Sequence, residues 1–244
     1  MSRYWDDTTV YSQPSAGELR AMARDSVKRA GKKAEKYNPV RCLTKRGSIC
    51  ETWWGQAWCE NLERYADYAN RIDRGKSYVR SGAVIDLSVD EGHVLAKVQG
   101  RRKAPYKVEI RIGRLPEAQC QAIIERCSRR IESLETLVKG EFPDELKDIF
   151  TEDGGLFPTP RDISFNCSCP DWAMMCKHVA AVMYGIGVRF DENPFYFFKL
   201  RGIDPDRFIS VAVESSVERM LEHANDESDR IIRDEDLTEL FGVI

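Results

Sequence analysis

The chain has 244 residues, of which 42% are hydrophobic and 32% are charged, as in a soluble globular protein. No apolar run approaches the roughly 18 residues of a membrane helix, and residues 1–7 lack the apolar segment of a secretory signal. The 8 cysteines are therefore expected in a cytoplasmic protein, without a membrane segment or disulfide framework. A formal net charge of −3 argues against a uniformly basic nucleic-acid-binding protein.

The first predicted helix spans residues 15–36 and is strongly basic. Ser15 and Glu18 have the spacing of a capping box, which marks its start. Its candidate phosphate contacts are Lys28, Lys32 and Lys33. A long run of one charge indicates either a solvated helix face or a helix that contacts nucleic acid, and both interpretations stay open.

A second helix is predicted over residues 52–70, with Thr52 as its cap, because Trp54, Trp58 and Leu62 recur at helical spacing. An aromatic stripe of this kind is typical of a helix that faces the core. The alternative is a platform on which nucleic-acid bases stack, and that role needs exposed rings.

Residues 71–114 are interpreted as a small antiparallel sheet with strands at 83–89, 93–99 and 106–112. The tip that joins the last two strands is basic. Its candidate nucleic-acid contacts are Arg101, Arg102 and Lys103. A basic hairpin tip is suited to gripping a phosphate backbone, although basic loops also serve solubility.

Helices are predicted over residues 116–150, with a break that leaves a short second helix at 141–150. Residues 153–160 form a loop that we take as a domain boundary. Two further helices are predicted at 193–200 and 206–223, and the segment after them is acidic. That segment is either a frayed tail or a docking segment for a protein partner.

The chemistry of the chain is concentrated in a Cys-x-Cys-x6-Cys-x-His motif. Its candidate metal ligands are Cys167, Cys169, Cys176 and His178. The first two lie on a predicted exposed-edge strand, where alternate side chains share a face. The last two begin a predicted helix that we expect to stop at Gly185 and Gly187. Because helical residues two apart face different directions, Cys176 should lie at the cap and His178 in the first turn.

Three thiolates and one imidazole form a ligand set that closes a tetrahedral zinc site. The alternative is a group of buried thiols and a core histidine, since cysteine is often a small apolar residue. Four protein ligands leave no open position on the metal. The predicted Zn²⁺ site is therefore structural rather than catalytic.

At these four residues the chain resembles the SWIM zinc-finger family, whose pattern is Cys-x-Cys, a variable gap and Cys-x-His. The Pro170-Asp171 turn and Lys177 also look like that family. The resemblance covers residues 155–190. It implies binding to DNA or to proteins, including helicase-like ATPases of the Swi/Snf type, and the layout of the whole chain looks like the stand-alone prokaryotic members.

We therefore expect an α+β fold: helices and a three-stranded antiparallel sheet, then a zinc-stapled strand-turn-helix module and C-terminal helices. The predicted parts are an α+β region at 1–152, the zinc finger with a packing helix at 153–202 and an acidic helical segment at 203–244. The chain lacks a Gly-x4-Gly-Lys-Ser/Thr phosphate loop, and an enzyme is not expected.

Two candidate functions fit these features. The first is a DNA-binding accessory protein in repair, recombination or remodelling, working with a helicase-like ATPase and contacting DNA through the basic residues above and Lys177. The second is a protein-interaction adaptor in which zinc is purely structural. The uneven basic clusters favour the first function, and the negative total charge favours the second.

Overall fold

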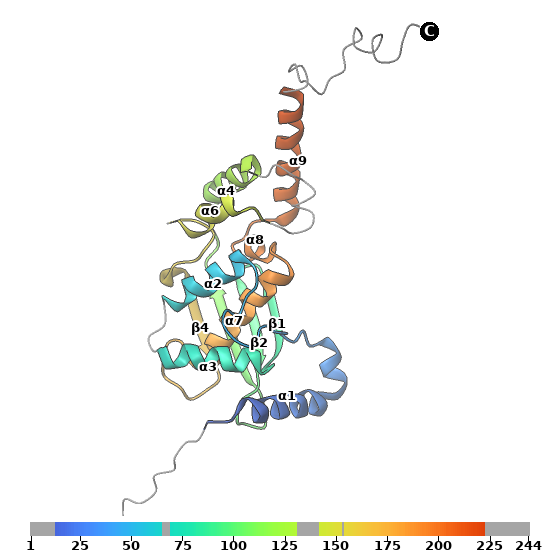
Figure 1. The fold of residues 1–244 in the computed structure, drawn as a ribbon, viewed down its shortest axis with the longest axis vertical. Helices are drawn as coiled ribbons and strands as arrows, with labels where there is room; N and C mark the ends of the chain where they lie inside the picture. The colour runs from blue at the N-terminus through green and yellow to red at the C-terminus, as the bar shows by residue number, and fades with distance from the viewer. Residues whose placement is uncertain (1–12, 65–68, 131–141, 153, 223–244) are drawn as a thin grey trace, which may run out of the picture.

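The computed structural model describes residues 13–64, 69–130, 142–152 and 154–222, and these form an α+β fold (Figure 1). Within them are eight α-helices and one four-stranded antiparallel sheet, in the order β1-β2-β3-β4. The strands are β1 (Val84–Asp90), β2 (His93–Val98), β3 (Tyr106–Ile112) and β4 (Ile163–Cys167). The predicted fold class and the three predicted strands of the meander are confirmed.

The sheet has one strand more than the predicted meander because the strand that carries Cys167 pairs with β3. Ile112 of β3 lies opposite Ile163, and Val108 lies opposite Cys167. The predicted edge strand of the metal site is therefore the edge of the main sheet, and the sheet continues across the predicted boundary at residue 153. Residues 113–162 separate the two strands in the sequence, so no local pattern predicts this pairing.

Three helices lie in front of the sheet in Figure 1: α2 (Trp53–Glu63), α3 (Ala69–Arg80) and α7 (Lys177–Glu192). The predicted helix with Thr52 as its cap is confirmed as α2, whereas the prediction of sheet from residue 71 was wrong, because residues 69–80 are helical. Gly75 permits the close packing of α3 on α7, since a Cβ there would lie 2.6 Å from the Cβ of Ala180. Packing against α7, which is distant in the sequence, thus favours a helix rather than a strand in residues 69–80.

The predicted end of α7 at Gly185 and Gly187 was also wrong, because the helix runs on to Glu192. These glycines are explained by close neighbours rather than by termination. A Cβ on Gly187 would lie 2.8 Å from the Sγ atom of Cys50, and one on Gly185 would lie 3.0 Å from a methyl group of Leu87. Close packing by neighbouring side chains stabilises α7 at these two positions and offsets the low helix propensity of glycine.

The predicted basic helix begins as expected. It is α1 (Ala16–Ala30), with the complete Ser15–Glu18 capping box, and it continues as a 3₁₀ helix, η1 (Gly31–Lys36). The remaining helices are α4 (Glu117–Arg130), α6 (Lys147–Thr151), α8 (Tyr196–Leu200) and α9 (Pro205–Glu222). A 3₁₀ turn, η2 (Asp144–Leu146), leads into α6. Of the predicted helix at 141–150, residue 141 lies outside the described residues, as does the acidic segment after residue 222.

The aromatic residues of α2 face the core, as predicted. Trp58 is 1% exposed and contacts the rings of Phe190 and Phe197, with centroids 5.1 and 6.2 Å away. Its indole nitrogen donates to the carbonyl of Met183 on α7 at 2.9 Å. A role for this stripe in stacking bases is thereby excluded, because its rings are not accessible. Among the described residues, no helix is long and apolar enough to cross a membrane.

Candidate metal centre and its cationic surroundings

The four predicted metal ligands converge at the junction of β4 and α7. The ligand atoms of Cys167, Cys169, Cys176 and His178 all lie within 4.8 Å of one another. The Sγ atoms of Cys167 and Cys176 each lie 3.9 Å from Nδ1 of His178. Ligand atoms around a tetrahedral zinc ion are separated by roughly 3.5–3.8 Å, given the usual zinc–ligand distances. The donor set and its spacing therefore fit a metal ion such as zinc.

The start of α7 positions two of these side chains as the sequence predicts. Cys176 is the N-cap with extended backbone angles, and its Sγ atom accepts a hydrogen bond from the amide of Val179 at 3.5 Å. His178 lies in the first helical turn and is 2% exposed. Because the cap turns the chain sharply, a thiol and an imidazole two positions apart reach the same point.

Hydrogen bonds and the helix terminus favour a thiolate at Cys176. A hydrogen bond with the Cys167 thiol, then bonds from His178 and from the Val179 amide, lower the pKa of Cys176 below its ordinary value, although burial opposes the shift. A metal binds the deprotonated thiol, so this environment prepares one ligand for metal binding.

The outer side of the imidazole is enclosed by aromatic rings. The Tyr106 ring stacks on His178 with centroids 4.0 Å apart, and the Tyr78 ring meets it edge-on at 5.4 Å. The Nε2 atom of His178 is buried, and the described residues offer it no hydrogen-bond partner. A Cβ on Gly100 would lie 3.2 Å from that atom and 2.7 Å from the Tyr106 ring. Packing rather than a second hydrogen bond thus orients the imidazole.

Cations surround the metal site. Lys177 is half-buried, and burial followed by repulsion from Arg74 and Arg71 lowers the pKa of its ammonium group. Arg71 also forms an ion pair with Asp171 of the loop between the ligands, at 3.3 Å. A zinc ion with three thiolates and a neutral imidazole carries one net negative charge, which these side chains would offset. Lys177, predicted as a nucleic-acid contact, thus lies among the cations beside the candidate metal site, where it would offset the charge of a bound zinc ion.

The hairpin tip between β2 and β3 joins the metal site to α1. Arg102 donates to the carbonyl of Ser168, which lies between two of the ligands, at 3.2 Å. On the other side, Arg29 of α1 donates to the carbonyl of Lys103 at 2.8 Å. Figure 1 shows α1 crossing beneath the sheet, next to this tip. Three segments that are far apart in the sequence therefore form one surface.

The predicted nucleic-acid contacts fall into two groups. Arg101, Arg102 and Lys103 are exposed at the hairpin tip. Lys28, Lys32 and Lys33 are exposed along α1 and η1, on the side lined by two surface hollows. No measured contact with nucleic acid assigns a role to either group, and both remain predictions.

Sequence reasoning missed several residues that the fold brings together. Arg41 and Arg80 lie beside Lys28 around one hollow, although no sequence pattern connects them. Trp172, in the loop between the ligands, is 84% exposed, and Met174 is 70% exposed. An aromatic residue inside a metal-binding loop is visible in the sequence, but its exposure depends on the fold.

The chain is similar to one curated protein of Mycobacterium tuberculosis (strain ATCC 25618 / H37Rv), described as "Uncharacterized protein Rv2102". The two are 39% identical over 165 residues, which cover 67% of this chain and 59% of the relative. The match thus spans less than two thirds of the relative's length. No protein-family model matches the chain, and no solved structure matches it. The chain is therefore a homologue of that mycobacterial protein that carries a Cys3His cluster able to hold a metal ion.

Proposed function

We propose that the protein is a DNA-binding accessory protein in which a structural zinc ion fixes a cationic hairpin against a basic helix. The observation that carries the proposal is the pair of hydrogen bonds made by the hairpin tip. Arg102 bonds the metal-binding loop, and the backbone of Lys103 accepts from Arg29 of α1. The zinc ion thus holds the hairpin at a defined distance from the helix, although it takes no part in the contact.

The charges on this surface suit a phosphate backbone. Arg101, Arg102 and Lys103 are consecutive, exposed and carried on a short turn that can approach the backbone closely. Arg102 also lies over the Tyr106 ring, with its guanidinium carbon 4.9 Å from the ring centroid, which limits the orientations of its side chain. The negative total charge does not oppose local binding, because salt screens charges more than about 10 Å away.

The accessory role rests on the resemblance of the metal motif to the SWIM family. By that resemblance, the protein works beside a helicase-like ATPase of the Swi/Snf type, in DNA repair, recombination or remodelling. Such a role is consistent with a metal group whose four protein ligands leave no site for substrate. Binding of the protein to a purified helicase-like ATPase of the Swi/Snf type, measured with and without DNA, tests this part of the proposal.

The direct test is DNA binding by the zinc-loaded protein across a salt series, on single- and double-stranded DNA. Each phosphate contact with duplex DNA contributes about 0.9 to the slope of log K against log salt. Reversing Arg101, Arg102 and Lys103 to Glu removes three contacts and should lower that slope by about 2.7 while weakening binding. The reversal also removes the hydrogen bond from Arg102 to the Ser168 carbonyl, so a small fall in the melting temperature is expected, about 2–4 °C for about 1 kcal/mol.

A matched control reverses three exposed cations elsewhere on the molecule: Arg129, Lys147 and Arg161. The control changes the net charge by the same amount, so it isolates the effect of position from that of total charge. Equal loss of affinity in both variants would show that only the total charge matters. Unchanged affinity in the hairpin variant would remove the hairpin from the contact surface.

A protein-interaction adaptor is the second candidate, and exposed apolar side chains favour it. Trp172 and Met174 project from the metal-binding loop, and Met220 and Leu221 are 66% and 67% exposed near the end of α9. Large exposed apolar residues often mark protein contacts. If no DNA binding is detected near physiological salt, the adaptor becomes the better proposal, and Trp172→Ala should then weaken the protein contact.

A further inference from the structure

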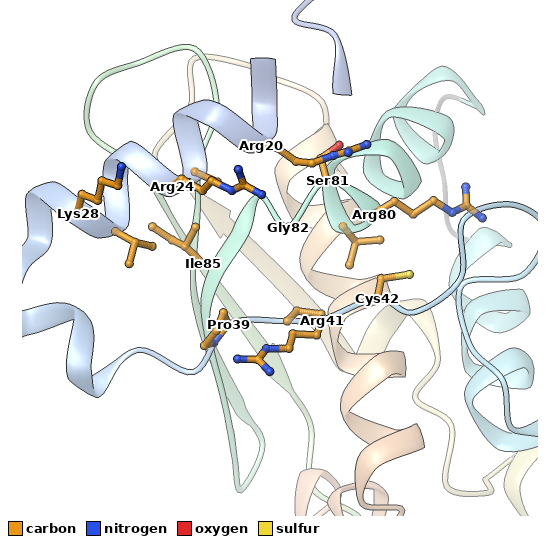
Figure 2. Close-up of a pocket in the computed structure, with 14 residues that line it drawn as sticks. Arg20, Arg24, Lys28, Pro39, Arg41, Cys42, Arg80, Ser81, Gly82 and Ile85 are labelled. Atoms are coloured by element: carbon orange, nitrogen blue, oxygen red, sulfur yellow. The ribbon is translucent and has the colours of Figure 1, made fainter. Parts of the chain in front are cut away.

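A surface hollow of about 760 Å³ lies beside α1, on the side of the helix that carries Lys28 (Figure 2). Arg20, Arg24 and Lys28 follow one another at intervals of four residues along the helix and border the hollow together. Arg41 lies across from them on the segment that follows η1, and Arg80 lies at the end of α3. Three separate parts of the chain thus bring five cations around one space.

Carboxylates do not balance these charges within the described part of the chain. The lining includes no Asp or Glu, and no described ion pair involves any of the five cations. Arg80 is held in place, because its guanidinium group donates to the carbonyl of Gly47. Like charges four residues apart on a helix repel one another, and Arg41 adds to that repulsion. A bound polyanion would relieve it.

The floor of the hollow has a different character. Ala23, Val40, Val79 and Ile85 line it, and each is at most 5% exposed. The volume is in the range of pockets that hold small organic ligands. An apolar floor beneath a cationic rim suits a ligand with a flat, weakly polar body and charged phosphate groups, more than it suits a bare inorganic anion.

We propose that this hollow binds a nucleotide, with its phosphates on the Arg24, Lys28 and Arg41 side chains and its base over the apolar floor. The source of the nucleotide is either a free nucleoside triphosphate or the 5′-phosphorylated end of a DNA strand, which share this chemistry. The inference goes beyond the proposed duplex-binding surface: both sites use α1, but the hairpin tip that carries the duplex proposal does not line the hollow.

The test measures binding of a fluorescent ATP analogue to the zinc-loaded full-length protein, with unlabelled competitors. Arg24→Ala and Arg41→Ala should each weaken binding by about tenfold or more, the usual effect of losing a charged hydrogen bond. Arg161→Ala, which changes an exposed arginine outside the hollow, should leave the affinity unchanged. Both pocket residues are exposed, so the melting temperatures of their variants should match the wild type.

The competitors identify the ligand. Inorganic tripolyphosphate should compete more weakly than ATP, because it cannot use the apolar floor. Competition by a 5′-phosphorylated oligonucleotide, and not by its unphosphorylated form, would assign the hollow to strand ends. Competition by ATP without effect of either oligonucleotide would assign it to free nucleotides. Equal competition by tripolyphosphate and ATP would overturn the nucleotide proposal.

The proposal also fails if the double variant Arg24→Ala/Arg41→Ala binds the analogue as tightly as the wild type, or if the wild type does not bind it. These failures are separable from failure of the proposed DNA surface. Reversal of Arg101, Arg102 and Lys103 should weaken duplex binding but leave the affinity for the ATP analogue unchanged.

Discussion

Cys176 serves two structural purposes, and two substitutions separate them. Its thiol is one of the four candidate ligand atoms of the Cys3His cluster, and it also caps α7 by accepting from the Val179 amide. Serine is among the best N-cap residues, so Cys176→Ser keeps the cap while removing the thiolate. Cys176→Ala removes both the cap and the ligand.

The size of each effect follows from the structure. Loss of the cap costs about 1 kcal/mol, which lowers the melting temperature of a chain of this size by about 2–4 °C. Loss of zinc should loosen β4 and the loop up to Cys176 without unfolding α7. The reason is that Val179, Tyr184 and Phe190 of α7 are each at most 1% exposed in the core, and burial of side chains of this kind contributes about 1.5–3 kcal/mol each.

The assay combines metal content by elemental analysis with thermal melting, with and without a chelator. With zinc, the wild type should melt above both variants, and both variants should lack bound metal. With chelator, the wild type and Cys176→Ser should melt together, and Cys176→Ala should melt about 2–4 °C lower. When zinc is removed from the wild type by chelator, amide hydrogen exchange should become faster in residues 163–176 and stay slow across α7.

Three results would refute parts of this reasoning. Full zinc content in Cys176→Ser would show that the thiol is not a ligand. A wild-type melting temperature that is unaffected by chelation would show that the metal does not stabilise the fold. A difference between the two variants that disappears in chelator would mean that the hydrogen bond from Val179 is not a helix cap.

Two further predictions concern neighbouring packing and charge. Gly100→Ala should destabilise the protein by about 1–3 kcal/mol and weaken zinc retention, because the new Cβ would press on the Tyr106 ring. A variant that melts at the wild-type temperature would contradict this prediction. The carboxylate of Glu63 is partly buried, which opposes ionisation, but hydrogen bonds from Lys76 at 2.7 Å and from Tyr184 at 2.6 Å outweigh burial and lower its pKa. A lowered folded-state pKa means that Glu63 stabilises the fold above its unfolded-state pKa of about 4.3 and loses that contribution as pH falls through the folded value. Glu63→Gln should therefore flatten the acid side of the stability profile, and an unchanged profile would argue against the prediction.

Much of the metal site could be predicted because its information is local. The Cys-x-His pair needs only the helix cap at Cys176, but the predicted strand that would carry both Cys167 and Cys169 was wrong in its end, because β4 stops at Cys167 and Cys169 lies just beyond it. The capping box of α1 and the strands of the meander are local in the same sense. In each case the pattern extends over a few residues and its physical cause lies within them.

The errors share a different origin. Residues 71–80 are predicted to belong to the sheet region, yet they form part of α3, because Gly75 lets this helix pack against Ala180 of α7. Gly185 and Gly187 read as a helix end, yet the chain continues as helix because neighbouring side chains leave no room for a Cβ. Intrinsic preferences of about 1 kcal/mol for glycine are too small to override such packing.

The sequence by itself determined the four candidate metal ligands, the cap that positions two of them and the alternating strands of the meander, since these depend on residues close together in the chain. Only the tertiary structure decided that β4 completes the sheet, that Arg29 meets the hairpin tip, and that Arg41 and Arg80 border the same hollow as Lys28. The physical reason is that these arrangements arise from packing between distant segments. Their partners are selected by the shape and burial of the whole core, which no local spacing encodes.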